Sequence, residues 1–303
     1  MLKSVIRSMR LRTLPLSLAG VICGVGLAVY FGGQSAIGGN SIGRILFLLM
    51  TTVSLQILSN LSNELGDYLS GTDNADRQGP NYSLQEGTLS EGGLRWLIGV
   101  FVGLCCVFGM AMIYFTFGTL IGVAPVALLL LGAAAIWAAM HYTLGKNPYG
   151  YRGWGDVFVF VFFGLVSVLG GYYIYAVALP AAEMLLPASA IGLFSVGVLN
   201  VNNIRDMATD AGTRSTVPLK IGERRAKIYQ TVLIAGGWLC LMVFTAIAGT
   251  GWRDCLYFVV LPLYVVHVVG VWKHSGRGLD AMLPLLVMST FLLAVLMGVG
   301  MNL

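Results

Sequence analysis

Long apolar runs separated by polar segments dominate the pattern of hydrophobic and polar positions along this chain. A helix needs about 20 apolar residues to cross a lipid bilayer, and the runs are continuous, whereas a half-buried strand would alternate. The nine predicted spans cover residues 14–32, 44–66, 94–116, 119–141, 154–178, 185–205, 226–249, 254–272 and 280–301. We therefore expect an all-α, polytopic membrane protein, a bundle of nine transmembrane helices.

The composition supports this fold class. Hydrophobic residues make up 57% of the 303 residues and charged residues only 10%, whereas soluble domains carry about 25% charged residues. No polar linker interrupts the series of spans, so residues 1–303 are expected to form a single integral-membrane domain in contact with the lipid bilayer. No basic tract is interleaved with aromatic residues, which argues against a nucleic-acid partner.

The distribution of Lys and Arg predicts the orientation, because basic residues collect on the cytoplasmic side of a membrane. With a cytoplasmic N-terminus, sixteen of the 18 basic residues fall in cytoplasmic segments, and Arg44 and Arg253 lie outside. An odd number of spans then places the C-terminus, Asn302-Leu303, on the external side. The long polar loops 67–93 and 206–225 fall inside, so we expect a multi-pass protein of the cytoplasmic membrane whose active site faces the cytoplasm.

A polar stretch closes the sixth span, where Asn202, Asp206 and Asp210 follow one another at intervals of four residues. On a continuous helix this spacing stacks the three side chains along one face. Carboxylate and amide oxygens suit a hard cation such as Mg²⁺, which commonly also holds a phosphate. The alternative is a polar helix end that is simply wetted by solvent.

A second, similar stretch ends the second span. Asn63 and Asp67 share one helix face, and Ser70-Gly71-Thr72 is expected to break the helix because glycine and small hydroxyl residues favour turns. Asp73 and Asp76 would then lie on a loop that folds back over Asp67. The sequence thus predicts a second cluster of oxygen ligands on the same side of the membrane.

Both stretches together would bring about five carboxylates into one pocket. Two unit charges about 4 Å apart repel by about 4 kcal/mol at an effective dielectric constant of 20. Such a cluster needs cations, and two Mg²⁺ ions bridged to a diphosphate would satisfy it. The alternative is that the acids form surface ion pairs with Arg77, Arg205 and Arg214.

Cationic and aromatic side chains follow the fourth span. Tyr142 and Lys146 form a Tyr-x-x-x-Lys pair, and Arg152 follows shortly after. Lys146 and Arg152 could bind a departing diphosphate, or could be ordinary cytoplasmic flanking residues. The rings of Tyr142, Tyr149 and Tyr151 could face an allylic carbocation, or form an aromatic belt at the interface.

At these residues the chain resembles the UbiA superfamily of membrane-embedded aromatic prenyltransferases, over nearly its whole length. Within the superfamily it is most similar to the branch that prenylates 1,4-dihydroxy-2-naphthoate in menaquinone biosynthesis. Glu64 stands where many members of that branch have Asp. The segments that carry the closer match are Arg12-Thr-Leu-Pro-Leu-Ser17, Asn63-Glu-Leu-Gly-Asp67 through Gly71-Thr-Asp73, Pro148-Tyr-Gly-Tyr-Arg-Gly-Trp-Gly-Asp156 running into Phe158-Val-Phe-Val-Phe-Phe-Gly164, and Asn202-Asn-Ile-Arg-Asp206 through Asp210.

The resemblance implies a Mg²⁺-dependent transfer of a polyprenyl group from polyprenyl diphosphate to an aromatic acid, with an intramembrane tunnel for the prenyl tail. For the naphthoate acceptor, CO₂ and diphosphate would leave and demethylmenaquinol would form. The metal ligands would be Asp67, Asp73, Asp206 and Asp210, with Lys146 as a further catalytic residue. The residues expected to bind diphosphate or substrate are Asn63, Asn202, Arg152 and Tyr142.

The sequence leaves two alternatives open. A different aromatic acceptor, such as 4-hydroxybenzoate or homogentisate, would use the same diphosphate site. An ion-coupled or proton-coupled transporter is disfavoured, because its acids should lie near the middle of the membrane and these lie at one mouth.

Overall fold

The computed structural model describes residues 2–32, 40–71, 83–249 and 251–303. Within these ranges the chain contains no strand, and nine helical stretches are long and apolar enough to cross a membrane, as predicted. The long helices are α2 (Leu14–Gly32), α3 (Ser41–Leu69), α4 (Glu91–Phe117), α5 (Val123–His141), α7 (Ser167–Ala176), α8 (Leu185–Arg205), α11 (Glu223–Ala248), α12 (Leu261–Lys273) and α13 (Met282–Met301). The short helices are α1 (Leu2–Ser8), α6 (Gly155–Val159), α9 (Met207–Asp210) and α10 (Val217–Ile221).

Several of the spans are composite. The fifth joins α6 to α7 through a π-helical segment, Phe160–Val166. The eighth and ninth begin with 3₁₀ turns, Trp252–Val260 and Gly276–Leu279, before α12 and α13. π-Helical turns inside α-helices are rare and occur frequently at functional sites, which directs attention to the fifth span.

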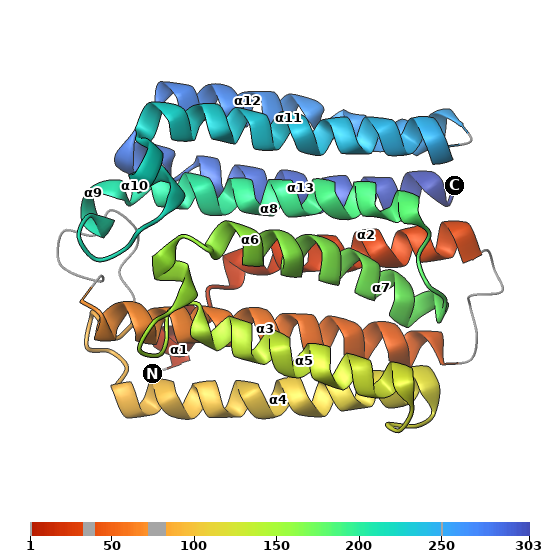
Figure 1. Cartoon of the computed structure of the whole chain (residues 1–303), viewed down its shortest axis with the longest axis horizontal. Helices are drawn as coiled ribbons and strands as arrows, with labels where there is room; N and C mark the ends of the chain where they lie inside the picture. Colours follow the sequence, from red (N-terminus) through yellow and green to blue (C-terminus); the bar gives the residue numbers. More distant parts are fainter. Residues whose placement is uncertain (1, 33–39, 72–82, 250) are drawn as a thin grey trace.

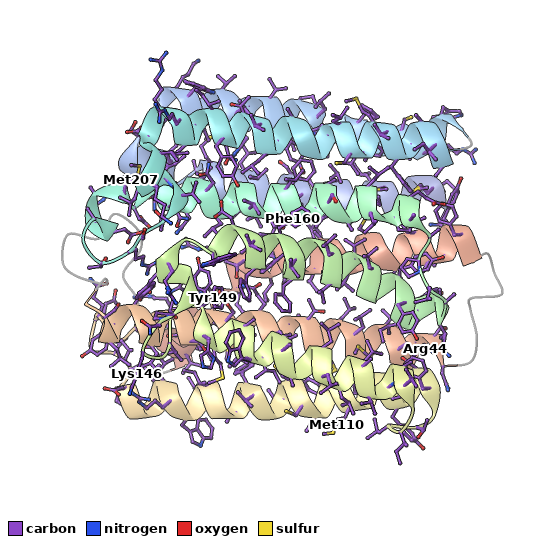
Figure 2. The ribbon with its side chains drawn as sticks, in the orientation of Figure 1. Arg44, Met110, Lys146, Tyr149, Phe160 and Met207 are labelled. Carbon is purple, nitrogen blue, oxygen red and sulfur yellow. The ribbon has the colours of Figure 1, made fainter. Side chains whose placement is uncertain are left out.

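The helices run side by side along the long axis of the molecule (Figure 1). In this view α11 and α12 form one edge and α4 the other, with α8, α13, α2 and α6–α7 between them. The N-terminus lies at the end that carries α9 and α10, which we call the polar end, and the C-terminus lies at the opposite end. Termini at opposite ends agree with the odd number of spans, and Lys146 and Arg44 also lie at opposite ends (Figure 2).

Glycine allows the closest helix contacts in the bundle. A Cβ at Gly24 of α2 would lie 2.1 Å from the carbonyl oxygen of Val168 on α7. A Cβ at Gly164 in the π-helical segment would lie 2.6 Å from Cα of Gly192 on α8. Membrane helices depend on such small residues because lipid provides little hydrophobic driving force for their association. These contacts draw α2, the fifth span and α8 together.

A chain of buried polar side chains fixes the outer helices to α8. Asn200 Nδ2 donates to Gln230 Oε1 at 2.9 Å, and Gln230 Nε2 lies 3.0 Å from His267 Nε2. His267 Nδ1 lies 3.0 Å from the carbonyl oxygen of Met282, so this nitrogen carries the proton and Nε2 accepts from Gln230. The chain links α8, α11, α12 and α13.

The outward surface is apolar. Leu130, Val232 and Val266, on three different spans, are each more than half exposed. Exposed apolar residues over helices of membrane length fit a bilayer rather than water. The molecule is therefore a multi-pass membrane protein.

Candidate functional site

A cavity of about 820 Å³ penetrates the bundle. At the polar end its lining includes the exposed residues Arg12, Arg277 and Asp280, so the cavity reaches the surface there. Its inner part is apolar and is lined by the residues Leu131, Phe162, Phe163, Val166 and Ile174. Three of these belong to the π-helical segment. The cavity thus joins a charged mouth to a hydrophobic interior.

The end of α3 supplies the first acidic group, as predicted. Asn63 and Asp67 both line the cavity, and α3 ends at Leu69, before Gly71 in the left-handed region at φ 73°. Gly66 has no side chain, which lets the chain after α5 approach Asp67 closely: a Cβ there would lie 2.5 Å from Thr143. Glu64 is fully buried and does not line the cavity. Its Oε1 accepts a hydrogen bond from the Leu84 amide at 3.0 Å.

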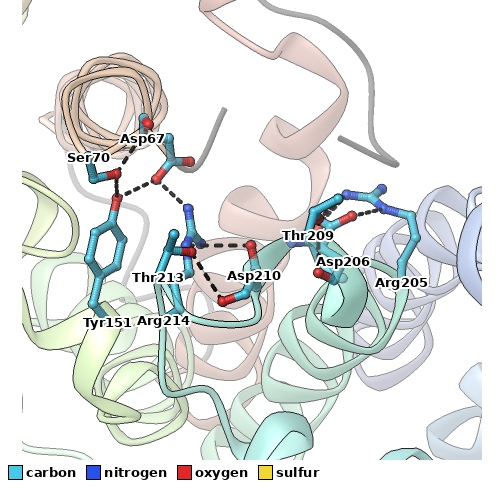
Figure 3. A network of polar contacts seen from close by, with 10 residues as sticks. Asp67, Ser70, Tyr151, Arg205, Asp206, Thr209, Asp210, Thr213 and Arg214 are labelled. Atoms are coloured by element: carbon cyan, nitrogen blue, oxygen red, sulfur yellow. Dashed lines mark hydrogen bonds and ion pairs between the residues drawn. The ribbon is translucent and has the colours of Figure 1, made fainter. Parts of the chain in front are cut away.

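Asp67 is buried and is held by two side chains from distant parts of the sequence (Figure 3). The hydroxyl of Tyr151 donates to Oδ1 at 2.9 Å, and the guanidinium of Arg214 forms an ion pair with the same oxygen. Arg214 also stacks on the Tyr151 ring, with Cζ 4.8 Å from its centroid. Both contacts use Oδ1, and Oδ2 makes no hydrogen bond within the described part of the chain.

The protonation states at this point follow from burial and charge. Burial raises the pKa of Tyr151 to about 12, with Asp67 adding to the shift and Arg214 opposing it, so Tyr151 remains a neutral donor. Burial alone would lower the pKa of Arg214, but the carboxylates of Asp67 and Asp210 outweigh it and raise the pKa above its ordinary value. Arg214 is therefore a permanent cation between two acids.

The second acidic group differs from the prediction in one respect. Asn202, Asp206 and Asp210 do not share one helix, because α8 ends at Arg205 and α9 begins at Met207. Asp206 lies between the two helices, and both of its oxygens accept from Arg205 at 2.7 Å. Consecutive residues do not face each other on a regular helix, so this pairing requires the helix to end there.

Arg205 fixes this corner of the cavity. It is buried, and besides Asp206 it donates to Asn202 Oδ1 at 2.9 Å and to Asp280 at 3.1 Å. The alternative prediction, in which the acids pair with Arg205 and Arg214, named the right partners. It placed these ion pairs on the surface, whereas the structure buries them. Arg77, the third cation considered, lies outside the described residues.

Most of the predicted site residues meet at the cavity. The lining includes Asn63, Asp67, Tyr142, Asn202, Asp206 and Asp210. Lys146 and Arg152 are exposed and do not belong to it, and the carbonyl oxygen of Arg152 accepts from Lys220 Nζ at 3.3 Å. Asp73 and Asp76 lie outside the described residues, so their roles stay predictions.

The N-terminal segment also contributes to the cavity, which the sequence pattern did not predict. Arg10, Arg12 and Thr13 line the cavity together with Gln56 and Asn60 of α3. Arg10 has a left-handed backbone at φ 48° and ψ 52°, which is unfavourable for a residue with a side chain and is often found at functional sites. The sequence indicated this part of the cavity only through the segment that begins at Arg12, one of those that carry the family resemblance.

The donor chemistry of the mouth fits Mg²⁺. Asp67 and Asp210 with Asn63 and Asn202 offer hard oxygen atoms, which this ion prefers. In the ranges that the structure describes, no three His, Cys, Asp or Glu side chains lie close enough together to hold a metal ion. Arg214 lies between Asp67 and Asp210, where a metal ion bound to both carboxylates would lie.

Comparison with known proteins identifies the family of this chain. Residues 17–289 match the model of the UbiA prenyltransferase family. The chain belongs to this family. Among its UbiA relatives, the 1,4-dihydroxy-2-naphthoate octaprenyltransferases of Escherichia coli (strain K12) and Haemophilus influenzae are 36% and 34% identical to it. The alignments cover 93% and 96% of this chain, and 88% and 93% of the relatives.

Solved structures of UbiA homologues share the fold. The apo homologue from Aeropyrum pernix K1 superposes with a TM-score of 0.67 at 15% identity, covering 93% of this chain and 96% of that one. A homologue from Archaeoglobus fulgidus bound to GPP and Mg²⁺ gives a TM-score of 0.60 at 16% identity, covering 96% and 100%. These matches establish that the nine-span bundle is the UbiA fold.

The Arg205 contacts predict a large effect on stability. Replacing Arg205 with Met leaves Asp206 buried and unpaired, which should lower the free energy of unfolding by about 3–5 kcal/mol. Arg95→Met is the matched control, because Arg95 forms an exposed pair with Glu91 one turn away and should lose less than about 0.5 kcal/mol. Unfolding in detergent measures the free energy of unfolding of both variants. If Arg205→Met loses no more than Arg95→Met, the Asp206 pair is not a stabilising contact.

Proposed function

We propose that this enzyme transfers a polyprenyl group from polyprenyl diphosphate to 1,4-dihydroxy-2-naphthoate, releasing diphosphate and CO₂ and forming demethylmenaquinol for menaquinone biosynthesis. The observation that carries the proposal is the single cavity that joins paired acids and arginines at the polar end to an apolar interior. Naphthoate prenyltransferases are 34–36% identical to nearly the whole chain, which supports this acceptor.

The diphosphate of the donor binds at the polar end. Asp67, Asp73, Asp206 and Asp210, with Asn63 and Asn202, would hold Mg²⁺, which when bound neutralises the charge that develops on the leaving diphosphate. Arg214 and Arg277, which line the mouth, provide positive charge beside it. Lys146 and Arg152 stay candidates for contacts with the outer side of the diphosphate.

The prenyl chain extends into the bundle. Leu131, Phe162, Phe163 and Ile174 line the inner cavity and exclude water from the carbon that loses diphosphate. The rings of Tyr149 and Phe158 stack with centroids 3.9 Å apart, and both residues line the cavity. Aromatic faces attract cations, so this pair can stabilise the allylic cation formed when the carbon–oxygen bond breaks.

We assign the acceptor to the polar wall that the N-terminal segment forms with α3. Thr13 Oγ1 accepts from Asn60 Nδ2 at 2.9 Å and from Gln56 Nε2 at 3.3 Å, so these three side chains form a preorganised polar cluster. Arg10 and Arg12 on the same segment supply positive charge for the acceptor's carboxylate. The ring carbon that bears this carboxylate attacks the allylic cation, and CO₂ leaves.

Activity should depend on the acids and on a divalent cation. Asp67→Asn and Asp210→Asn should each lower the rate at least about 100-fold, because each removes charge from the diphosphate site. The wild type should lose activity in EDTA and regain it with Mg²⁺, and it should prefer dihydroxynaphthoate to 4-hydroxybenzoate. Product mass spectrometry with purified protein and radiolabelled polyprenyl diphosphate measures all three.

Glu91→Gln is the control for these variants, since Glu91 is exposed, lies outside the cavity and pairs only with Arg95 among the described residues. It should retain full activity. Full turnover in EDTA would contradict the metal site, and preferential prenylation of hydroxybenzoate would contradict the acceptor.

The polar end is proposed to face the cytoplasm, where the charged substrates are made. In a background without the five native cysteines, Lys273→Cys at the polar end should resist a membrane-impermeant maleimide until intact cells are opened. Thr119→Cys, in the exposed turn at the other end, should react in intact cells. The opposite pattern of labelling would reverse the topology and with it the access of the substrates.

A further inference from the structure

The two arginines at the mouth are held in different ways. Arg205 makes two 2.7 Å contacts with Asp206 and further hydrogen bonds to Asn202 and Asp280. Arg214 binds Asp67 through Nη2 alone, and its Nε lies 3.7 Å from Asp210, beyond hydrogen-bond distance. Among the described residues this buried Nε has no hydrogen-bond partner. Arg205 is therefore locked in place, whereas Arg214 is held mainly by charge.

The backbone of Arg214 is fixed independently of its side chain. Its amide donates to the carbonyl oxygen of Asp210 at 3.1 Å, and the amide of the next residue, Ser215, donates to the carbonyl oxygen of Tyr151 at 2.9 Å. The Tyr151 ring supports the guanidinium from one side. The side chain can therefore change its partner while the loop stays in place.

Competition between cations favours such a change. Asp67 and Asp210 are buried, and Arg214 forms ion pairs with both of them. A divalent ion that takes both carboxylates as ligands must compete with Arg214 and would be repelled by it. A guanidinium binds phosphate oxygens through two parallel hydrogen bonds, so a diphosphate offers Arg214 a better partner than one carboxylate oxygen.

We propose that Arg214 is an exchangeable counter-ion: it neutralises Asp67 and Asp210 in the empty enzyme and turns to the diphosphate when metal and donor bind. The inference rests on the proposed function, because it requires the diphosphate to bind at this mouth. The exchange makes the binding of metal and the binding of diphosphate mutually favourable. Diphosphate draws Arg214 away from the carboxylates that the metal needs, and metal on the carboxylates releases Arg214 for the diphosphate. Metal alone should bind weakly, and metal with diphosphate should bind tightly.

Arg214→Gln tests the exchange through two affinities that should move in opposite directions. With the competing cation removed, Mn²⁺ alone should bind the detergent-solubilised full chain at least about 10-fold more tightly. Inorganic diphosphate in saturating Mg²⁺ should bind at least about 10-fold more weakly. Electron paramagnetic resonance measures the first affinity and titration calorimetry the second.

Arg224→Gln is the matched control, because Arg224 is exposed at the start of α11 and the same charge is removed at the same end of the bundle. It should leave both affinities within about 2-fold of wild type. Arg214→Lys covers the case in which Arg214→Gln does not fold: it keeps the charge, so metal affinity should stay near wild type while diphosphate affinity falls.

The outcomes separate this inference from the proposed function. If the wild type binds Mg²⁺ with diphosphate and Arg214→Gln changes neither affinity, or weakens both together, the exchange is wrong and the diphosphate site stands. If the wild type binds neither metal nor diphosphate, both proposals are wrong. Opposite shifts in Arg214→Gln, absent from Arg224→Gln, support the exchange.

Discussion

The ion pair between Asp67 and Arg214 is the contact on which the site depends. These residues are 147 positions apart, and their pairing joins the end of α3 to the loop after α9 across the mouth of the cavity. A charge in an apolar bundle is costly unless it is paired, so each acid here requires a cation and each cation an acid. Tyr151, Asp210 and Ser70 are organised around this one pair (Figure 3).

The rest of the bundle separates this charge from the hydrocarbon that the enzyme handles. Glycine contacts draw the fifth span against α2 and α8, and the π-helical segment contributes Phe162, Phe163 and Val166 to the inner cavity. The polar chain from Asn200 to His267 keeps α11 and α12 against α8 on the far side. One cavity can therefore hold a charged head and an apolar tail, the two parts of a prenyl diphosphate.

The sequence predicted those features that depend on local pattern. Runs of about 20 apolar residues located the nine spans, and Gly71 marked the end of α3 because its backbone lies in the left-handed region. The fourth predicted span began at residue 119, whereas α5 begins at Val123 because glycines at positive φ, Gly118 and Gly122, form the preceding turn.

Features that depend on pairing across the fold were not predictable in this way. Periodicity treated Asn202, Asp206 and Asp210 as one helical face, but α8 ends between them, at the point where Arg205 pairs with Asp206. Arg214 was considered only as a possible surface partner, since nothing local indicates that it meets Asp67. Arg10 and Thr13 reach the cavity because the segment before α2 packs on α3, a tertiary contact with no periodic signature.

A crystal structure of the enzyme with Mg²⁺ and an unreactive polyprenyl thiodiphosphate tests the position of both substrate parts most directly. We expect the diphosphate between Asp67 and Asp210 at the polar end, with the prenyl chain running past Phe162 toward Ile174. A diphosphate bound away from both acids, or a prenyl chain lying outside the bundle against lipid, would contradict it.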